Sequence, residues 1–438
     1  MKRTALLLIL CTGFVIAAFA KRPDPPAPAE VRTRLSQNVT YSSSYIKKGR
    51  WTVHTVVADL LDPTLSLRLG KGLENIAGLE RVQNILHRFD SLHHGFATAL
   101  AGVNANFWRA GSNHPMGPTV SEGVILRTDQ YKNWSSVAVT TTGSVHIDRF
   151  SVTAGIRTRF GLIPIEHFNY RHDSLSLSAY TSYFGSTVPF LDTSGIFLAS
   201  QDTITDDSES DSVVTATVDS VYSRSPESGT LKIQFRYLRA PLANTLTPCR
   251  ITAIDTSIMA IPVDGGVLSF GRGRFPLFFS LFVGDTFSLE SRVSPVLPDP
   301  VRVMTGGTPR IVRDGKVSVE WQEEGLRKRR FVTGRYARTA FGVSKNGSQI
   351  IMVTVEGSSR RARRQGIGLA DLAKVLIDRG AWQALNFDGG GSATMVVSDQ
   401  TVAPATGTRY SRKISTTLFL VETKHGKPGH TGTSPGVR

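Results

Sequence analysis

"ALNFDGGGSATMVV", residues 384–397, consists of two apolar runs that are joined by Asp388 and three consecutive glycines. Short apolar runs bounded by turn residues are typical of buried strands. Glycine loses more backbone entropy on folding than any other residue, so three in a row are unfavourable unless the turn requires them. The stretch therefore predicts two buried strands and a tight turn that exposes Asp388 at the rim of a sheet.

The glycine loop also has the composition of a ligand-binding turn. The N–H groups of Gly389–Gly391 can approach a ligand closely, because no Cβ atoms intervene. Ser392 and Thr394 add hydroxyl groups, so the loop and Asp388 offer the donors and acceptors that a sugar needs, or the donors that a phosphate needs. A plain hairpin turn is the alternative, since Asp and Gly are common turn residues, but three glycines exceed what a two-residue turn requires.

Two familiar catalytic loops are excluded at this position. A Walker loop ends in Gly-Lys-Ser or Gly-Lys-Thr, and this loop has no lysine. A nucleophile elbow requires Gly-x-Ser-x-Gly, whereas "GGSAT" has Thr394 in place of the last glycine. The loop is therefore neither a P-loop nor the elbow of an α/β-hydrolase.

The remaining chain predicts an α+β fold of mainly antiparallel or mixed sheets with a few helices packed on them. Runs such as "WTVHTVVADL", "LKIQFRYL" and "IIMVTVEG" are rich in β-branched residues. "GLADLAKVLIDRG", residues 368–380, predicts a helix with Leu369, Leu372, Ala373 and Leu376 on one face and Gly380 after its end. A second helix is predicted over residues 73–90. No repeat or central linker is visible, so we predict a single large domain over residues 41–423, with residues 200–300 as an insertion or subdomain.

The ends of the chain predict export. Residues 1–20 have a basic start, an apolar run and an Ala-x-Ala site, which is typical of a signal peptide rather than a membrane anchor. Residues 21–40 read as a proline-rich leader and residues 424–438 as a disordered tail. Cys249 would be the single thiol after cleavage, so no internal disulfide is expected. These features suit a bacterial protein that is periplasmic, attached to the cell surface or secreted.

The net charge of +16 includes two basic clusters, "RKRR" at 327–330 and "RRARR" at 360–364. Charge runs of this kind are usually solvated loops, and the alternative is a field that attracts anionic glycans or lipids. Nucleic acid is not expected as a partner, because an exported protein rarely meets it and no nucleic-acid-binding motif is present. The sequence gives no indication of an oligomeric state.

Two further segments contain candidate site residues. In "ARTAFGVSKNGSQIIMVTVEG", residues 337–357, the Asn346-Gly347 pair predicts a hairpin that brings Arg338 and Glu356 to one edge. An arginine there can bind a phosphate bidentately, and a salt-bridged edge is the alternative. In "AGVNANFW", residues 101–108, two asparagines precede two aromatic residues that could stack on a sugar, unless the segment is simply a buried strand.

These segments, in this order, resemble the phosphodiester glycosidase family. The resemblance extends to "MGPTVSEGVIL" at 116–126 and "VRVMTGGTPRIVRDGK" at 301–316, and it is strongest from about residue 338 to 420, where "LNFDGGGSATM" and "SRKISTTLFL" both fit. The chain departs from the family pattern at Asn104-Ala105-Asn106, where Asn-Gly-Gly is usual, and at Glu356-Gly357-Ser358, where Asp-Gly-Arg is frequent. Both departures concern the identity of the sugar more than the class of reaction.

The resemblance implies hydrolysis of a sugar-1-phosphodiester, such as an N-acetylglucosamine-1-phosphodiester, to free sugar and a phosphomonoester. Asp388 is expected as nucleophile or base and Glu356 as the second carboxylate. The remaining expected contacts are to the phosphate, from Arg338, Gly389, Gly390, Gly391 and Arg412, and to sugar hydroxyls, from Asn104, Asn106, Asn386, Ser392 and Thr394. No cofactor or metal is expected, although a divalent cation between Asp388 and the phosphate would be chemically compatible. The rival interpretations are a non-catalytic binder of a cell-surface glycan or sugar-phosphate polymer, and an envelope protein that docks through its basic clusters.

Overall fold

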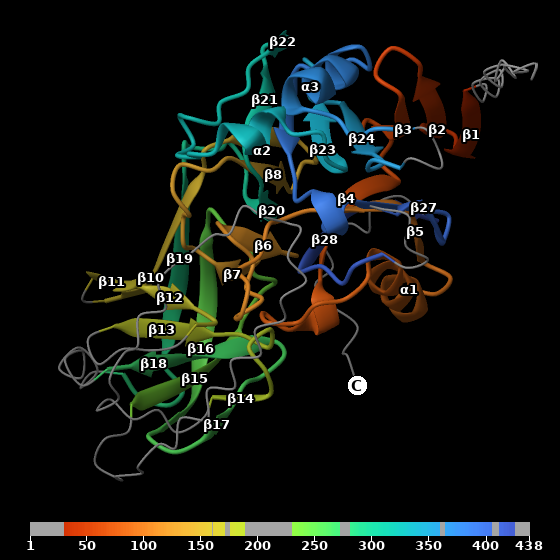
Figure 1. Cartoon of the computed structure of the whole chain (residues 1–438). Helices are drawn as coiled ribbons and strands as arrows, with labels where there is room; N and C mark the ends of the chain where they lie inside the picture. Colours follow the sequence, from red (N-terminus) through yellow and green to blue (C-terminus); the bar gives the residue numbers. More distant parts are fainter. Residues whose placement is uncertain are drawn as a thin grey trace, which may run out of the picture.

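A computed structural model describes residues 30–159, 161–170, 176–188, 230–271, 281–359, 364–404 and 411–424. Strands dominate these residues and three α-helices accompany them, which confirms the predicted α+β fold (Figure 1). The strands form two eight-stranded and two five-stranded sheets, and β14 (Thr187–Val188) pairs separately with β17 (Met259–Ala260). The expected signal peptide at 1–20 and most of the tail lie outside the described residues.

The first eight-stranded sheet contains the hairpin predicted from the sequence. In sheet order its strands are β1 (Val31–Ser36), β2 (Val39–Ile46), β3 (Trp51–Asp59), β24 (Gln349–Val355), β23 (Arg338–Val343), β25 (Gln383–Asn386), β21 (Arg310–Arg313) and β22 (Lys316–Val317). β23 and β24 pair in antiparallel fashion, and Gly347 in their turn has a φ of +74°. The leader was expected to extend to residue 40, but residues 31–40 form β1 and the start of β2. β1 pairs in antiparallel fashion with the edge of β2 and so belongs to the sheet.

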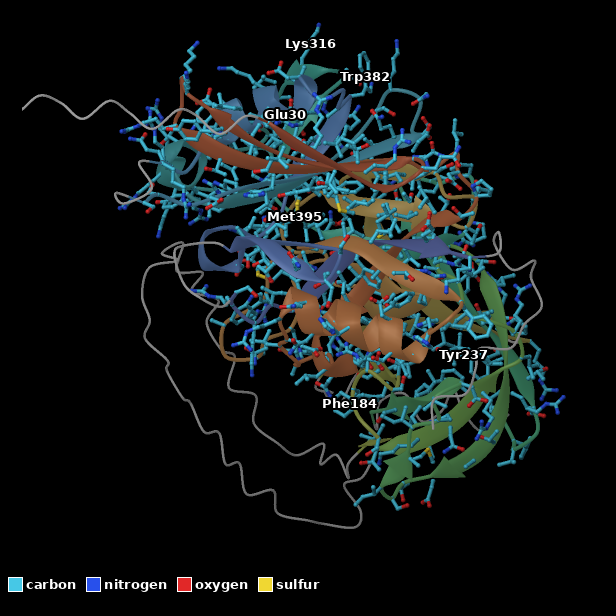
Figure 2. All side chains as sticks on the ribbon, turned by 90° about the vertical axis from the view of Figure 1, so that its right-hand side faces the viewer. Glu30, Phe184, Tyr237, Lys316, Trp382 and Met395 are labelled. Carbon is cyan, nitrogen blue, oxygen red and sulfur yellow. The ribbon has the colours of Figure 1, made fainter. Side chains whose placement is uncertain are left out.

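A five-stranded sheet packs against this sheet. Its order is β27 (Gln400–Pro404), β26 (Thr394–Val397), β5 (Ala97–Asn104), β28 (Thr416–Thr423) and β4 (Leu65–Lys71). Leu385 before the glycine loop and Met395 after it are fully buried in the core between these sheets, and Figure 2 shows Met395 between the two layers. The two apolar runs of the opening stretch are therefore buried strands, β25 and β26, in different sheets.

Two further sheets form the other half of the molecule (Figure 1). The smaller has the order β7 (Val124–Arg127), β6 (Thr119–Ser121), β20 (Val301–Gly306), β8 (Ser136–Thr140) and β9 (Val145–Asp148). The larger has the order β11 (Gly161–Ile165), β10 (Ser151–Thr158), β19 (Thr286–Ser294), β16 (Leu246–Asp255), β15 (Leu231–Tyr237), β18 (Gly265–Phe270), β13 (Leu177–Tyr180) and β12 (His167–Phe168). One hydrophobic cluster joins the two sheets, so the described part of 200–300 lies within a shared core.

The helices differ in how closely they follow the sequence pattern. α3 (Leu369–Ile377) buries the four predicted residues, and Gly380 after it has a φ of +95°, which confirms this helix. α1 spans Val82–Leu92, so the helix expected from residue 73 begins later. The preceding segment is held in a compact loop, where the Lys71 ammonium donates to the carbonyl of Gly78 at 2.6 Å and the N–H of Leu73 donates to Glu80 at 2.9 Å. The N–H groups of Gly72 and Glu80 also donate to the distant carbonyls of Ser415 and Ile414, so tertiary bonds override the helical pattern there.

Two predictions about the surface have different outcomes. Residues 327–330 are exposed at the start of α2 (Arg329–Thr333), as expected for a solvated charge run, whereas only Arg364 of the second basic cluster lies within the described residues. Among the helices that the structure describes, none is both long and apolar enough to cross a membrane.

Candidate active site

Asp388 lies where β25 and β5 end beside the start of β23. It follows β25, and its N–H donates to the carbonyl of Ala105 just after β5, at 3.0 Å. The side chain of Asn104 donates back to the Asp388 carbonyl at 2.6 Å, and the N–H of Phe387 donates to Thr339 in β23 at 2.9 Å. The backbone on both sides of the carboxylate is therefore fixed by bonds to two different sheets.

Each of the three glycines answers a different steric requirement. A Cβ atom on Gly389 would lie 2.9 Å from the carbonyl oxygen of Ala337, and a Cβ atom on Gly391 would lie 2.6 Å from the guanidinium carbon of Arg412. Gly390 has a φ of +55°, in the left-handed region that L-residues with a Cβ atom disfavour. The triplet thus lets the loop lie directly on the start of β23 on one side and under Arg412 on the other.

The loop amides have partners within the protein. The N–H of Gly389 donates to Oδ1 of Asp388 at 2.9 Å, and the N–H of Gly390 donates to the carbonyl of Ala337 at 2.9 Å. These two groups were expected to bind phosphate, and the structure instead uses them to hold the carboxylate and to dock the loop. The Ser392 hydroxyl, buried at 1% exposure, also hydrogen-bonds Asp388 rather than standing open to a sugar.

The carboxylate of Asp388 is half-buried beside positive charge. Burial raises its pKa to about 6, while hydrogen bonds from Ser392 and the N–H of Gly389, together with the charges of Arg412 and Arg338, act in the opposite direction. A carboxylate with a pKa near neutrality beside specific charged partners is a candidate for acid–base or nucleophilic chemistry. The prediction that Asp388, Arg338 and Arg412 share one site is therefore consistent with their electrostatic contact.

Arg338 is almost completely buried at the start of β23. Its guanidinium donates to the carbonyls of Phe331 and Gly334 and lies 5.1 Å from the ring centroids of Phe331 and Tyr336. Burial lowers its pKa to about 10, with Tyr336 and Asp388 opposing that shift. Its Nε is buried and has no partner among the described residues, so one donor of this cation is unsatisfied.

The asparagines fall into two groups. Asn104 has no exposed surface, and its Oδ1 accepts from the Thr339 hydroxyl at 2.7 Å and from the N–H of Thr394 at 2.9 Å. With its amide bound to Asp388, Asn104 is fully bonded inside the protein, which differs from the sugar contact expected of it. It ties the two sheets together under the glycine loop.

Asn106 and Asn386 retain polar atoms without partners. Asn106 donates to Thr119 at 3.3 Å and Asn386 to the carbonyl of Thr308 at 2.6 Å, but neither Oδ1 has a partner among the described residues. The same holds for the hydroxyl of Thr394. Buried acceptors of this kind are unusual in proteins and point to a missing partner such as water or substrate.

The "TGG" at the end of β20 was not recognised as part of the site. A Cβ atom on Gly306 would lie 3.1 Å from Oδ1 of Asn106 and 2.6 Å from the carbonyl of Met116, and one on Gly307 would lie 2.7 Å from the carbonyl of Asn386. These glycines allow the two asparagine segments to approach one backbone. Two consecutive glycines at a strand end were the available signal.

Glu356 lies in a separate buried network. Its Oε1 contacts Nε2 of His54 at 3.0 Å, its Oε2 pairs with Arg364 at 2.5 Å, and the other ring nitrogen of His54 contacts the Tyr41 hydroxyl at 2.9 Å. The charges that act on Asp388 are those of Arg412 and Arg338. The structure thus gives both oxygens of Glu356 partners other than Asp388, and its role as second carboxylate stays a prediction. In the described part of the chain, no cluster of three or more His, Cys, Asp or Glu side chains is placed to hold a metal ion.

Two alanine substitutions distinguish the left-handed backbone conformation of Gly390 from the close contact between Gly391 and the Arg412 side chain. Gly390→Ala is expected to lower the free energy of unfolding by about 1–2 kcal/mol, because the new residue must keep a left-handed conformation. Gly391→Ala should lose less than about 0.5 kcal/mol, because its Cβ atom meets the end of an exposed, flexible arginine that can move. Urea unfolding of both variants measures the difference, and equal losses would contradict this assignment.

A family model of known proteins matches the part of the chain that contains the candidate site. Residues 253–421, which include Arg338, Glu356, the glycine loop and Arg412, match the family model described as phosphodiester glycosidase. N-acetylglucosamine-1-phosphodiester alpha-N-acetylglucosaminidase from Bos taurus is 32% identical over 109 residues, and its counterpart from Homo sapiens is 30% identical over 109 residues. Each match covers 23% of this chain and 20% of the relative, so it spans about a fifth of the relatives' length.

Two solved structures share the fold over most of the chain. A hypothetical protein from Synechocystis has a TM-score of 0.60 at 20% identity, covering 91% of this chain and 64% of that one. A putative exported protein from Burkholderia pseudomallei has a TM-score of 0.54 at 18% identity, covering 87% of this chain and 76% of that one. Residues 253–421, which include the glycine loop and its arginines, therefore resemble the phosphodiester glycosidase family.

Proposed function

We propose that this chain hydrolyses the bond between the anomeric carbon of a sugar and a phosphodiester oxygen, releasing the sugar and a phosphomonoester. The observation that carries the proposal is the half-buried Asp388 between two guanidinium groups, within the segment that matches the family model. The curated relatives are named for action on N-acetylglucosamine-1-phosphodiesters, which makes such compounds the first substrates to test.

The phosphomonoester can leave with little proton donation from the protein. The phosphomonoester that leaves has a second pKa of about 6, so it departs as a stable anion near neutral pH. The site must therefore bind the phosphate and stabilise positive charge that develops on the sugar ring. Arg338 and Arg412 supply the first function and the carboxylate of Asp388 supplies the second, as nucleophile or as general base toward water.

The unpartnered acceptors give the sugar a place to bind. Oδ1 of Asn106 lies beside Gly306, and the backbone carbonyl of Asn386 lies beside Gly307. The Oδ1 atoms of both asparagines lack a partner among the described residues, and each can accept a hydrogen bond from a sugar hydroxyl or an N-acetyl N–H. Asn104 is not part of this contact, because its side chain is already bonded. The sugar would then lie next to Asp388, which follows Asn386 by two residues.

The experiment is to follow release of free sugar from a panel of sugar-1-phosphodiesters, beginning with N-acetylglucosamine. Proton NMR of the first-formed anomer distinguishes the two roles of Asp388, since a nucleophile gives retention and a general base gives inversion. Hydrolysis of at least one compound supports the proposal. Binding without release across the panel would instead identify the chain as a non-catalytic binder of sugar-phosphate glycans.

The pH profile tests the protonation state of Asp388. Either role requires the ionised carboxylate, so kcat/KM should fall about tenfold per pH unit below about pH 6 and stay level above it. The phosphodiester remains a monoanion through this range, so the substrate does not contribute to the fall. A profile that instead falls above pH 6 would mean that Asp388 acts as the proton donor.

A further inference from the structure

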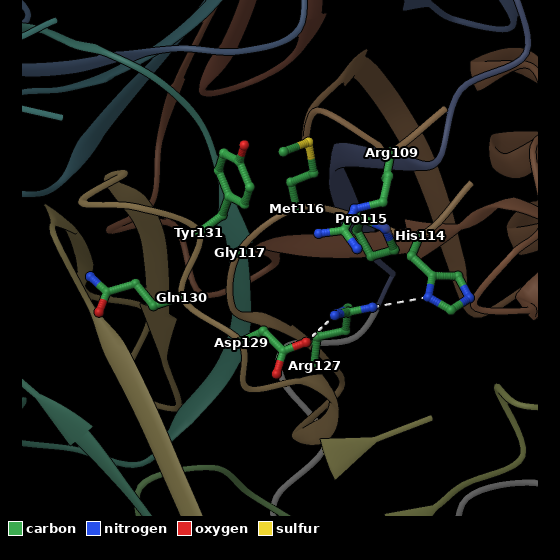
Figure 3. Close-up of a pocket in the computed structure, with 9 residues that line it drawn as sticks. All are labelled: Arg109, His114, Pro115, Met116, Gly117, Arg127, Asp129, Gln130 and Tyr131. Carbon is green, nitrogen blue, oxygen red and sulfur yellow. Dashed lines mark hydrogen bonds and ion pairs between the residues drawn. The ribbon is translucent and has the colours of Figure 1, made fainter. Parts of the chain in front are cut away.

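A pocket of about 290 Å³ lies beside the Asn106 segment and contains charges that the proposed reaction does not use. Arg109, His114, Met116, Arg127, Asp129 and Tyr131 line it, and Figure 3 shows these side chains around the pocket. Two guanidinium groups face a single carboxylate, so the lining carries a net positive charge when the imidazole is neutral. Such a pocket disfavours a cation and favours an anion.

Arg127 is the fixed element of this pocket. Its side chain is only 7% exposed, and it pairs with Asp129, donates to Nδ1 of His114 at 2.9 Å and lies 5.1 Å from the ring centroid of Tyr170. Its Nε has no partner within the described residues. The guanidinium is therefore held in one orientation by three neighbours and still has an unsatisfied donor.

His114 is neutral in this setting. A guanidinium can only donate, so Nδ1 of His114 must accept and the ring hydrogen lies on Nε2. Burial, together with the nearby charges of Arg127, Lys71 and Arg109, lowers the pKa of His114 to about 4, while Asp129 opposes this shift. The positive charge of the pocket thus comes from the arginines and does not change with pH near neutrality.

The pocket adjoins the proposed active site through two contacts. The carbonyl of Met116 lies against Gly306, which in turn lies against Oδ1 of Asn106. Met116 also belongs to an aromatic cluster with Phe107 and Phe331, and the carbonyl of Phe331 accepts from Arg338. A substrate that is bound at Asp388 and Asn106 could therefore extend past Met116 into the pocket.

We propose that this pocket binds a second acidic group of the substrate, a carboxylate or a phosphate, on the alcohol side of the phosphodiester. The inference rests on the proposed function and narrows its substrate class to sugar-1-phosphodiesters whose aglycone is itself an acid. The exposed residues 327–330, which follow the cluster member Leu326, extend the positive field beyond the pocket for a longer anionic chain.

A matched pair of substrates tests this inference. One carries glycerol as the aglycone and the other glyceric acid, so that they differ by one carboxylate. The acidic compound is expected to show a kcat/KM about tenfold higher at low salt, through KM rather than kcat, and the advantage should shrink as salt rises. Equal values, or a preference for the glycerol compound, would overturn the inference.

Variants that remove either a positive or a negative charge from the pocket control for misfolding. Arg109→Gln and Arg127→Gln should reduce the ratio of kcat/KM between the two substrates toward one, whereas Asp129→Asn should increase it. Lys316→Gln, at the exposed edge of β22, is the control and should leave the ratio unchanged. Ratios that move in the same direction for Arg127→Gln and Asp129→Asn would show a general disturbance of the fold and contradict the assignment.

The proposed function and this inference can fail separately. If neither compound is hydrolysed, the proposed function fails, and calorimetric binding of both compounds to the wild-type chain still tests the pocket. Tighter binding of the glyceric acid compound, lost in Arg127→Gln, would support the anion site without catalysis. Hydrolysis of both compounds at equal efficiency would leave the proposed function standing and remove the inference.

Discussion

Asp388→Asn is expected to lower kcat for a sugar-1-phosphodiester by about 10³-fold or more, since a neutral amide can act neither as nucleophile nor as base. The amide has nearly the shape of the carboxylate, its oxygen can still accept from the N–H of Gly389, and its amino group can donate to the hydroxyl of Ser392. Substrate binding should therefore change little. Single-turnover sugar release, with binding measured by calorimetry, separates the two effects.

The same variant should be more stable than the wild type at neutral pH. The pKa of Asp388 is raised to about 6 from an ordinary 3.8, so the folded state holds its proton more tightly than the unfolded state. The burial of this group therefore costs no stability below about pH 4 and destabilises the fold increasingly up to about pH 6, after which the cost is constant. Removing the charge should raise the melting temperature at pH 7.5 and leave it unchanged at pH 4.

The size of this gain follows from the shift. A difference of about two pKa units corresponds to about 3 kcal/mol as an upper limit, which partial solvent access reduces. Asp371→Asn, which removes a carboxylate paired with Lys374 on the surface of α3, is the control and should change stability by less than about 0.5 kcal/mol. A loss of stability in Asp388→Asn at pH 7.5 would contradict the account of Asp388 as a strained ionised group.

Arg338→Met is expected to lower kcat/KM by about 10²–10³-fold, because the variant removes a preorganised cation from a buried site beside Asp388, where we propose that it binds the phosphate. Methionine fills part of the space between Phe331 and Tyr336 without a charge. The carbonyls of Phe331 and Gly334 lose their donor, so some stability is lost as well.

The pH profile separates a catalytic contribution of Arg338 from a merely structural one. Because the guanidinium lowers the pKa of Asp388, its loss should move the acidic limb of the kcat/KM profile to higher pH. Lys345→Met, which removes an exposed cation at the turn of the same hairpin, is the matched control and should move neither the rate nor the limb. A reduced rate with an unmoved limb would assign Arg338 only to packing of the α2 segment.

Local patterns in the sequence determined several elements of this protein. Alternation and the Asn346-Gly347 turn predicted the β23–β24 hairpin, and the spacing of leucines predicted α3, because both depend on contacts between near neighbours in the chain. The glycine triplet predicted the tight turn after Asp388, since the left-handed φ of Gly390 and the close approach of Gly389 to the Ala337 carbonyl leave little choice of residue at those positions. Such features need no knowledge of distant partners.

Only the tertiary structure determined the hydrogen-bond partner of each buried polar residue. Asn104 and Asp388 are 284 positions apart, and Glu356 and His54 are 302 apart, so no spacing rule could show that Asn104 would hold the Asp388 backbone or that Glu356 would pair with a histidine. The start of α1 was missed for the same reason, because the N–H groups of Gly72 and Glu80 bond to the distant carbonyls of Ser415 and Ile414. The partner of the Gly390 N–H, the carbonyl of Ala337, is likewise distant in the sequence. Secondary-structure propensity depends on a few neighbouring residues, whereas buried polar groups obtain their hydrogen-bond partners only when the sheets pack together.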